Sequence, residues 1–511
     1  MTAAQPPEGY LGTTARITSG PAPELVEAGY ALETADAPLL HRGLTLADLA
    51  HLVELTECGA LTPGEAAPLC AALLDWLDTA AERFPYDPVY GDAYNSRERE
   101  LERTLGPAAG RLHLGRTRRE AGRIAFRLEL RDRLLGLHTD VAAFASAAAD
   151  QAARHAATLW ADHTYLQPAQ PSTFGHYLGG FAEQAVRHLD RIEAAFGRAD
   201  VSPGGAGGAG GTRLPVDRAR LAARLGFASA GAHTRDAMWS TDALADAVMA
   251  AVQATQTVAQ LASDLEIFAS PAFGYVTLDA SLCRASVLMP QKRNPYALPV
   301  LRGGAGTLLG TLTGLLATGL TPSARTDNWL HAYGEVAGAL DLAGRLVRLG
   351  RAVTAGLTAD ADTLASQAAS HFTAAADLAE DLSMRFGLDY RTAYRVVGRA
   401  VAGALSRQEA GLTVSGIRAA AEQVTGAPLP VTAGLLTAAT DPLPAVLARD
   451  GLGGASPSRV RQHARAVRRR AAAARRWNTA RRDRIATAES DLLTAAKTVA
   501  SGHPPPAVTP S

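Results

Sequence analysis

Lysine is almost missing from this chain of 511 residues, in which Lys292 and Lys497 stand against forty-eight arginines. Cysteine is scarce as well, with only Cys58, Cys70 and Cys283 at irregular spacing. An odd number of thiols without paired spacing excludes a regular disulfide framework and a zinc cluster, and favours a reduced cytoplasmic protein. The formal net charge is zero, so no overall field favours nucleic acid or a membrane surface as a partner.

Aromatic residues make up only 5% of the chain, and strand-like apolar runs are missing. Alanine-rich stretches such as 142–157 favour helix instead. Residues 303–324 carry no charge, which by length alone would allow a bilayer span. Their glycine and threonine content favours a buried bundle helix with protein on every side. The sequence therefore predicts an all-α protein of long helices with no membrane span.

The breaker pattern divides the chain into three predicted domains. Short helical patterns separated by turn signals fill residues 1–115, after a polar arm that we expect to be flexible. Long helical patterns fill residues 116–366 and are typical of an extended bundle whose loops carry the chemistry. Shorter helices return over residues 367–511, where the last ten residues, with three consecutive prolines, are expected to be disordered.

A basic segment lies within the third region. Arg459 to Arg484 holds eleven arginines and one acidic residue, a net charge of about +10. The first interpretation is a solvated helix face anchored by Val467 and Trp477. Pairing with acidic residues of the same or another subunit is the second interpretation, and nucleic-acid binding is a weak third.

Gly205-x-Gly207-x-x-Gly210 matches the letter pattern of a dinucleotide-binding loop. No strand precedes it and no βαβ unit surrounds it, so the context that gives this pattern its meaning is missing. No Gly-Lys-Ser/Thr ends the run, which also excludes a Walker phosphate loop. We interpret it as a mobile turn between bundle helices, and we expect neither a cofactor nor a metal.

The window around Lys292 combines groups suited to one kind of chemistry. A small hydroxyl, Ser286, lies six residues before the cation and a carboxamide, Asn294, lies two residues after it, between Pro290 and Pro295. An ammonium is a compact point charge on a flexible stem, which a guanidinium cannot replace. The alternative to a functional role is that Lys292 has been retained by chance. Together these groups favour a site that grips a carboxylate and handles a proton.

Two further windows are polar. Thr117, Arg118 and Arg119 stand at the predicted start of a helix, where backbone amides and guanidinium groups suit an anion, although an ordinary charged helix start is the alternative. Residues 162–171 are dense in hydrogen-bonding groups just before another helix, and by themselves would fit a capped turn. The three windows together indicate a shared polar site.

In this order, the three windows resemble the signature regions of the argininosuccinate lyase, fumarase and aspartase superfamily. The resemblance is closest to argininosuccinate lyase, extends from about residue 91 to 349, and includes Met289-Pro290-Gln291-Lys292, the superfamily's most specific motif. It implies a three-domain fold, a homotetramer with a core of twenty long helices, and active sites shared between three subunits. It also implies an anti elimination on a small dicarboxylate substrate that gives fumarate.

The resemblance assigns roles to the residues that match. Ser286 is similar to the catalytic base on a mobile loop, and its hydroxyl must be acidified by local amides and by nearby positive charge such as Lys292. Lys292 and Asn294 would stabilise the enediolate formed when the proton leaves. The positions that hold the substrate are matched by Thr117, Arg118, Arg119, Thr164, Gln167, Asn294, Arg325 and His331.

Departures from the family pattern concern the leaving group. Tyr165 stands where the family has the histidine associated with its protonation, and a phenol is a poor acid near neutrality. Three alternatives remain for this step. Tyr165 donates the proton, another residue such as His163 donates it, or the leaving group departs without a proton. Arg119 replaces an asparagine and favours a more anionic substrate. Tyr94 replaces the histidine of an Asp-x-His pattern, and Ala285-Ser286-Val287 keeps the first serine of Gly-Ser-Ser but lacks its glycine and its second hydroxyl.

The segment expected to recognise a guanidino group is also rewritten. Residues 323–331 read Ser-Ala-Arg-Thr-Asp-Asn-Trp-Leu-His, in which only Arg325 clearly survives from the family pattern. Trp329 would add apolar or stacking surface in this segment. Argininosuccinate is therefore not the expected substrate.

Three functional hypotheses follow. The first is a lyase that eliminates a nitrogen leaving group from a substituted succinate, or runs the reverse addition, in specialised metabolism. The second is a catalytically silent structural or binding homologue, which the loss of the histidine favours and the survival of Ser286, Lys292 and Asn294 opposes. The third is a true argininosuccinate lyase with compensating residues.

Overall fold

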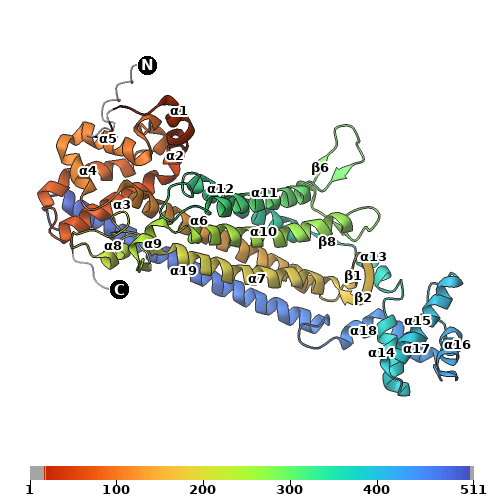
Figure 1. Ribbon diagram of the computed structural model, residues 1–511. Coiled ribbons are helices and arrows are strands. Elements are labelled where there is room, and N and C mark those ends of the chain that lie inside the picture. Colours follow the sequence, from red (N-terminus) through yellow and green to blue (C-terminus); the bar gives the residue numbers. More distant parts are fainter. Residues whose placement is uncertain (1–15, 18, 507–511) are drawn as a thin grey trace.

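A computed structural model describes residues 16, 17 and 19–506 and shows a long helical bundle with a smaller helical domain at each end (Figure 1). Most of the expected N-terminal arm and part of the expected C-terminal tail lie outside the described residues. Three separate hydrophobic cores correspond to the bundle and to the two end domains. The expectation of an all-α fold is confirmed.

The N-terminal domain packs around α3 (Ala37–Glu57), in which Leu49, Leu52 and Leu55 are completely buried. α4 (Pro63–Leu77) begins at a turn signal because Thr62 and Glu65 form a reciprocal capping box. The other elements of this domain are α1 (Pro23–Leu25), η1 (Val26–Tyr30), α2 (Ala31–Ala35), η2 (Ala81–Arg83), η3 (Pro88–Tyr90), α5 (Ala93–Leu105) and η4 (Gly106–His113).

The bundle consists of long helices whose buried faces are rich in alanine, which allows the helix axes to approach closely. Its members are α6 (Arg118–Arg154), α7 (Phe174–Ala199), α10 (Asp242–Phe268), α11 (Ala297–Thr318) and α12 (Ala332–Ala355). α6 alone has 37 residues and is about 55 Å long at 1.5 Å per residue. The bundle therefore separates any two loops at its opposite ends by a distance that one active site does not span.

Short strands, which the sequence did not indicate, join the bundle helices. β1 (Leu159–Thr164) and β2 (Gln167–Thr173) form an antiparallel hairpin, and β6 (Arg284–Ala285) and β7 (Arg293–Asn294) form a second one. β3 (Val201–Ser202) pairs in parallel with β4 (Ser229–Ala230), and β5 (Val276–Thr277) pairs antiparallel with β8 (Thr358–Ala359). Short helices complete the connections: α8 (Arg218–Arg224), α9 (Thr234–Trp239), η5 (Ala280–Leu282) and α13 (Ala361–Ala368).

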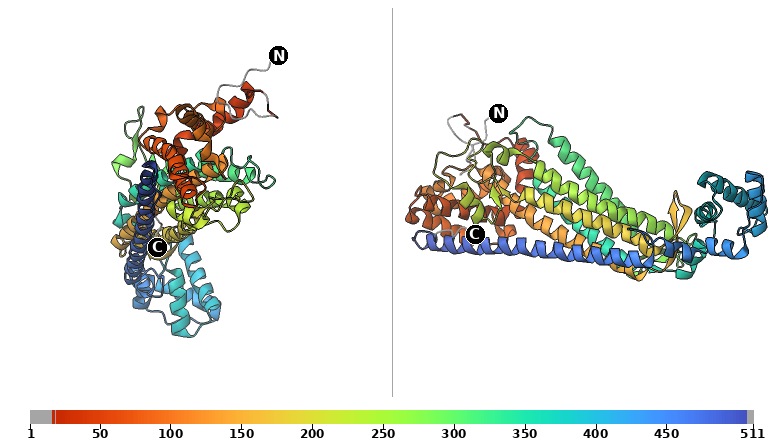
Figure 2. Two further views of the ribbon diagram at one scale, coloured as in Figure 1. Left: turned by 90° about the vertical axis from the view of Figure 1, so that its left-hand side faces the viewer. Right: turned by 90° about the horizontal axis from the view of Figure 1, so that it is seen from below.

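The region expected as one C-terminal domain is divided in space. A compact cluster contains α14 (Ala375–Phe386), α15 (Tyr390–Ser406), α16 (Val414–Thr425), α17 (Ala433–Thr440) and α18 (Pro442–Ala448). α19 (Pro457–Ala500) then leaves this cluster and runs back along α6 and α7 to α3 and α4 of the N-terminal domain (Figure 2). Its buried residues belong to the cores of the bundle and of the N-terminal domain, because a helix of 44 residues is long enough to reach both.

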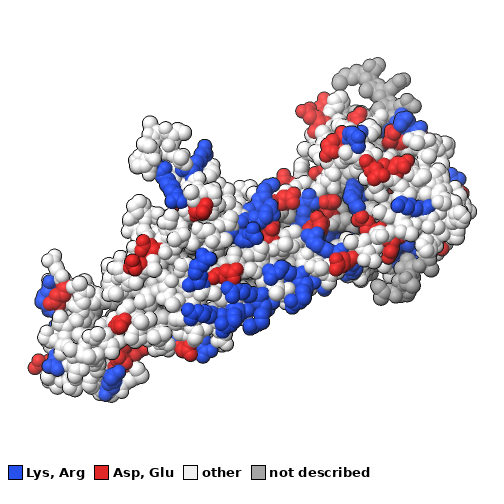
Figure 3. Space-filling view, turned by 180° about the vertical axis from the view of Figure 1, so that it is seen from behind, with Lys and Arg blue, Asp and Glu red and all other residues white. Residues whose placement is uncertain are grey.

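The arginine-rich segment forms the first part of α19, and basic side chains gather along the middle of the bundle (Figure 3). Val467 is buried and Trp477 is half-buried, as expected of its anchors. Five of its arginines form ion pairs with acidic residues of the same chain, at Asp450, Asp150, Asp190, Asp132 and Asp200. The segment is therefore in part an anchored helix face and in part paired with acidic residues of the same chain, as the first two interpretations expected.

The uncharged segment 303–324 is largely helical, as predicted, but this chain alone does not supply the expected protein on every side. α11 covers most of it, yet only one side of the helix is buried, while Val300, Leu309 and Leu316 on other sides are exposed. Within the described residues, α11 is the helix long and apolar enough to cross a membrane, a criterion that core helices of soluble proteins also meet. The chain thus presents an uncharged helix surface that it does not cover itself.

Candidate active site

Ser286 begins the loop that joins β6 to β7, and its hydroxyl lies among backbone amides. Its Oγ accepts a hydrogen bond from the N–H of Met289 at 3.0 Å and from the N–H of Leu288 at 3.3 Å. Two donors directed at one oxygen stabilise the alkoxide relative to the hydroxyl, since hydrogen bonds to the charged form favour that form. The local amides expected to acidify this hydroxyl are therefore present.

Lys292 ends the same loop, and its side chain is exposed without a partner in the described chain. Asn294 lies in β7, where its Nδ2 donates to the carbonyl oxygen of Arg284 at 3.1 Å and fixes the carboxamide to the hairpin. The hairpin projects from the bundle (Figure 1), and Val287 is fully exposed at its tip. The Lys292 window therefore faces no other element of its own chain.

The second window forms the tip of the β1–β2 hairpin. Thr164 ends β1, Gln167 begins β2, and all side chains at this tip are exposed. Tyr165 and Leu166 have φ of 54° and 57°, a left-handed conformation that costs non-glycine residues about 1 kcal/mol or more each. This strained turn directs the phenol of Tyr165, which is 99% exposed, into solvent.

His163 does not share that exposure. A register shift between Asp162 and His163 turns the imidazole inward, with its ring centroid 5.1 Å from that of Trp160 and 5.9 Å from that of Tyr275. Burial lowers the pKa of His163 and disfavours its cationic form. The structure therefore does not support His163 as the acid that replaces the family histidine.

The third window lies at the N-terminus of α6, where Thr117 is the capping residue and accepts the N–H of Glu120 at 3.4 Å. Arg118 is half exposed, and its Nε lies 3.2 Å from a carboxylate oxygen of Asp92. A substrate carboxylate at this position would have to compete with Asp92 for the guanidinium. Thr117 and Arg118 are thus placed side by side at a helix N-terminus.

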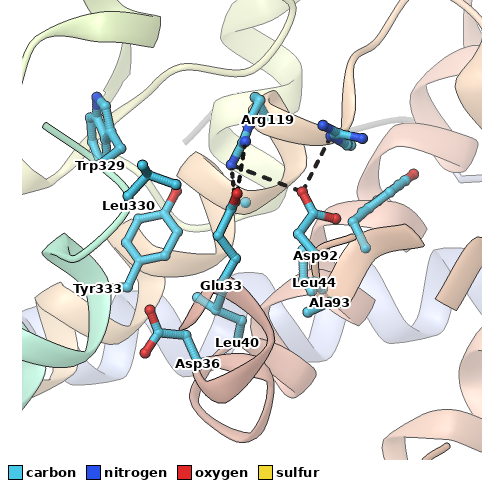
Figure 4. A pocket seen from close by; sticks show the side chains of 13 residues that line it. Glu33, Asp36, Leu40, Leu44, Asp92, Ala93, Arg119, Trp329, Leu330 and Tyr333 are labelled. Atoms are coloured by element: carbon cyan, nitrogen blue, oxygen red, sulfur yellow. Dashed lines mark hydrogen bonds and ion pairs between the residues drawn. The ribbon is translucent and has the colours of Figure 1, made fainter. Parts of the chain in front are cut away.

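Arg119 points away from solvent and pairs with Glu33 through both of its terminal nitrogens (Figure 4). Asp92 lies 3.9 Å from the same guanidinium. The charge of Arg119 is therefore compensated within the chain, and the argument from Arg119 for a more anionic substrate does not hold. The sequence carried no signal for Glu33, because α2 is a short helix far from Arg119 along the chain.

Asp36 lines the same small cavity as Glu33, Arg119 and Tyr333. Burial raises the pKa of Asp36 to about 6, and a hydrogen bond from the amide of Gly334 opposes the rise only in part. A carboxyl group of this kind changes charge near neutral pH.

Replacing Asp36 with asparagine is expected to change how stability depends on pH. Because the pKa of Asp36 is raised from 3.8 to about 6 on folding, the folded wild type binds this proton more tightly and loses stability as pH rises through that window. Above pH 6, the Asp36→Asn variant should therefore be more stable than the wild type, on the order of 1–2 kcal/mol. Chemical denaturation between pH 4 and 8 measures this difference, and Asp75→Asn on the exposed side of α4 is the control. Parallel profiles for wild type and Asp36→Asn would contradict the assignment.

A buried ion network supports the helix that carries Thr117 and Arg118. One carboxylate oxygen of Asp48 accepts a hydrogen bond from the guanidinium of Arg116, and the other lies 3.4 Å from the guanidinium of Arg97. All three side chains are 1% exposed. Tyr94, which stands at a family histidine position, contributes its phenol oxygen to Arg116 at 3.0 Å. The role of Tyr94 is therefore to hold the backbone just before Thr117.

The glycine run is packed against the same helix, so its interpretation as a mobile turn is wrong. The Glu120 carboxylate accepts the N–H of Gly205 at 2.6 Å and the N–H of Gly207 at 2.7 Å, and residues 204–206 at the start of the run are buried. Gly207 has φ of 58°, and a Cβ there would lie 2.5 Å from the carbonyl oxygen of Gly211. These positions require glycine because the backbone folds around the carboxylate of Glu120.

The rewritten segment 323–331 presents a different surface from the one expected. Trp329 is 3% exposed, and its ring lies 3.6 Å from the guanidinium carbon of Arg123, so it offers no stacking face to a substrate. Arg325 and His331 are exposed and without hydrogen-bond partners in the described chain. Arg325 and His331 therefore remain available, whereas Trp329 belongs to the core.

No single chain brings the three windows together. Thr117 and Thr164 flank opposite ends of α6, about 55 Å apart by the length of that helix. The Lys292 window extends from a third position beyond α10 and α11 (Figure 1). Within one chain, the three windows therefore lie at three separate places.

Comparison with known proteins identifies the family. A family model described as "Lyase" matches residues 48–310. The chain is 30% identical over 420 residues to an argininosuccinate lyase of Methanoculleus marisnigri, covering 81% of this chain and 84% of that protein. It is 35% identical over 417 residues to an argininosuccinate lyase of Halobacterium salinarum, with the same coverage.

Solved structures agree with these relatives. An EDDS lyase in complex with formate matches with a TM-score of 0.83 and 27% identity, over 95% of this chain and 97% of that one. A fumarate lyase from Mesorhizobium sp. BNC1 has the same fold, with a TM-score of 0.67, 20% identity, and coverage of 85% and 96%. The chain belongs to the fumarase/aspartase superfamily as an argininosuccinate lyase-like carbon–nitrogen lyase.

Proposed function

We propose that this lyase eliminates a nitrogen leaving group from a substituted succinate of the N-substituted aspartate type and releases fumarate, or catalyses the reverse addition. The observation that carries the proposal is the placement of the Ser286 Oγ between two amide donors, on the same short loop as the free ammonium of Lys292. The relatives include an EDDS lyase whose variant was solved with bound fumarate. A soluble cytoplasmic enzyme in specialised metabolism, without cofactor or metal, would fit this chemistry.

In the proposed mechanism, Ser286 as alkoxide removes the proton from the carbon next to a substrate carboxylate. Lys292 and Asn294 stabilise the negative charge that then develops on that carboxylate. The neighbouring carbon loses nitrogen as the double bond of fumarate forms. Tyr165 is the candidate proton donor to the nitrogen, because its phenol is exposed at the tip of a rigid hairpin.

The remaining candidates hold the substrate. Thr117 and Arg118 provide a hydroxyl and a cation at a helix N-terminus for one carboxylate. Thr164 and Gln167 provide polar groups for the other from the β1–β2 hairpin. Arg119 acts through its pair with Glu33 and shapes the pocket beside Arg118. Arg325 and His331 are the exposed groups of the rewritten segment 323–331.

We further propose that the chain assembles as a homotetramer in which three chains contribute to each site. The separation of the windows in one chain supports this assembly. The exposed, uncharged surface of α11 also supports it, since a contiguous surface without charge is a typical contact between subunits.

A charge placed on α11 is expected to break this assembly. Gly310 is exposed, and a Cβ there would meet no atom of its own chain within 4 Å, so Gly310→Asp has room within the monomer. In a tetramer the same carboxylate would be buried without a partner, so we expect a smaller assembly and loss of activity together. Light scattering after size-exclusion chromatography measures the mass. Gly197→Asp, at an equally open glycine of α7, should leave mass and activity unchanged, and an active Gly310→Asp tetramer would exclude α11 from the contact.

The reaction itself is tested with a panel of substrates. Purified protein is incubated with N-substituted aspartates, argininosuccinate and nitrosuccinate while the absorbance of fumarate is followed, and fumarate with amines tests the reverse direction. Fumarate from an N-substituted aspartate supports the proposal. If no member reacts in either direction, the proposal fails, and enzymatic cleavage of argininosuccinate would show that the rewritten segment still accepts a guanidino group.

A further inference from the structure

A cavity of about 600 Å³ lies between α7, the first turns of α19 and the turn at residues 450–454. It borders the start of α7, directly after the β1–β2 hairpin, but none of its lining residues belongs to the three windows or takes part in the proposed mechanism. Its volume is within the usual range of small-molecule sites, which is about 300–1,000 Å³. Its lining consists of five glycines, three aliphatic residues and six polar or charged residues.

Glycines in the first two turns of α7 line this cavity. A Cβ at Gly175 would lie 2.3 Å from the carbonyl oxygen of Ala152, so packing requires glycine there, whereas a Cβ at Gly179 would make ordinary contact with Nδ1 of His463 at 3.4 Å. At Gly180 a Cβ would meet nothing within 4 Å. Glycine costs a helix about 0.5–1 kcal/mol relative to alanine, so the chain accepts this cost at Gly180 without a packing reason of its own.

An apolar side chain stands at the edge of the cavity. Leu452 is completely exposed on the turn before α19, next to Gly453 and Gly454. The carbonyl oxygen of Gly453 is bonded to Nε2 of His176 at 3.1 Å, which ties this turn to α7. A fixed turn that presents leucine beside a groove suits contact with an apolar group from outside the chain.

The charges around the cavity leave one cation uncompensated. Glu183 is paired with His463 at 3.0 Å, and Arg459 is paired with Asp450 at 3.3 Å. Arg469 also lines the cavity, and its guanidinium has no partner in the described part of the chain. Among the charged residues of the lining, Arg469 is therefore the one left to pair with a ligand, beside the glycines and aliphatic side chains.

We propose that this cavity binds a small amphiphilic monoanion, an apolar ring system or short chain that carries a single carboxylate or sulfonate. The apolar body lies over Gly180 and against Leu452, and the anionic group pairs with Arg469. The ligand is distinct from the doubly charged substrate of the active site, and the proposal does not depend on the reaction.

The test uses two fluorescent probes of the same ring system on the full-length protein. 1-Anilinonaphthalene-8-sulfonate carries the anion, and N-phenyl-1-naphthylamine lacks it. We expect the sulfonate to bind at least tenfold more tightly, and Arg469→Gln to remove most of that preference. Gly180→Val, which fills the floor, should weaken both probes at least tenfold. Gly197→Val, at an exposed glycine of the same helix that is equally open but outside the cavity, should change neither.

Equal binding of the sulfonate by the wild type, Gly180→Val and Gly197→Val would overturn the proposal, because the probe would then lie elsewhere. Equal affinity of the wild type for the two probes would also overturn it, since the anion would contribute nothing. If Gly180→Val instead lowered the mass of the assembly in light scattering, the cavity would be a contact between copies of the chain and not a ligand site.

Discussion

Replacing Ser286 with alanine is expected to lower kcat/KM for elimination by about 10³-fold or more while leaving the fold intact. The hydroxyl oxygen accepts two backbone amides and otherwise lies in solvent, so its loss removes the proposed base without opening a cavity. A methyl group has no basic atom, and the carbon-bound proton would then have only water to receive it. Steady-state formation of fumarate from the best substrate of the panel measures the change.

Ser281→Ala is the matched control for this prediction. Ser281 lies on η5 of the same connection, is exposed, and bonds to Asp279, so its removal perturbs the segment without touching the proposed chemistry. Activity close to wild type is expected. If Ser286→Ala retained activity within tenfold of wild type, Ser286 would not be the base, and the mechanism would need another group.

Replacing Asp48 with alanine is expected to cost about 3–5 kcal/mol in the free energy of unfolding of the N-terminal domain. Asp48 is the shared partner of Arg97 and Arg116, and removing it leaves two guanidinium groups in a site that is 1% exposed. Activity should fall as well, because Arg116 directly precedes Thr117 at the start of α6. Chemical denaturation and the activity assay measure the two effects.

Two further variants separate charge from packing in this experiment. Asp48→Asn keeps the size of the side chain and removes its charge, so it should retain part of the stability but still show a large loss. Glu100→Ala removes a largely exposed ion pair with Arg103 in the same domain and should change stability far less. If Asp48→Ala and Glu100→Ala were equally mild, the buried network would not support the helix that carries Thr117.

The sequence grouped the candidate residues of one loop but not the partners of distant segments. Ser286, Lys292 and Asn294 are close along the chain, and the hairpin of β6 and β7 keeps them together, so their proximity follows from local spacing. The pairing of Arg119 with Glu33 joins residues 86 positions apart, and no local pattern indicated it. The inference from Arg119 to a more anionic substrate failed for that reason.

Glu120 shows a signal that was present but easily misread. Thr117 and Glu120 have the spacing of a capping box, and the box predicts that the glutamate returns to the backbone of its own helix. In the structure its carboxylate instead accepts the amides of Gly205 and Gly207. The glycines of the run are therefore explained by a carboxylate that is distant along the chain. Considered without that carboxylate, the run looked like a mobile turn.

By itself, the sequence determined the helical class and the family and indicated candidate loops for the chemistry, because helix propensity, breakers and short motifs are properties of neighbouring residues. Only the tertiary structure decided that α19 returns along the bundle, that Trp329 stacks on Arg123, and that α11 leaves an uncharged side exposed. These features depend on which surfaces meet after folding. Burial and charge compensation between distant segments are set by the packed chain, and no window of neighbouring residues contains them.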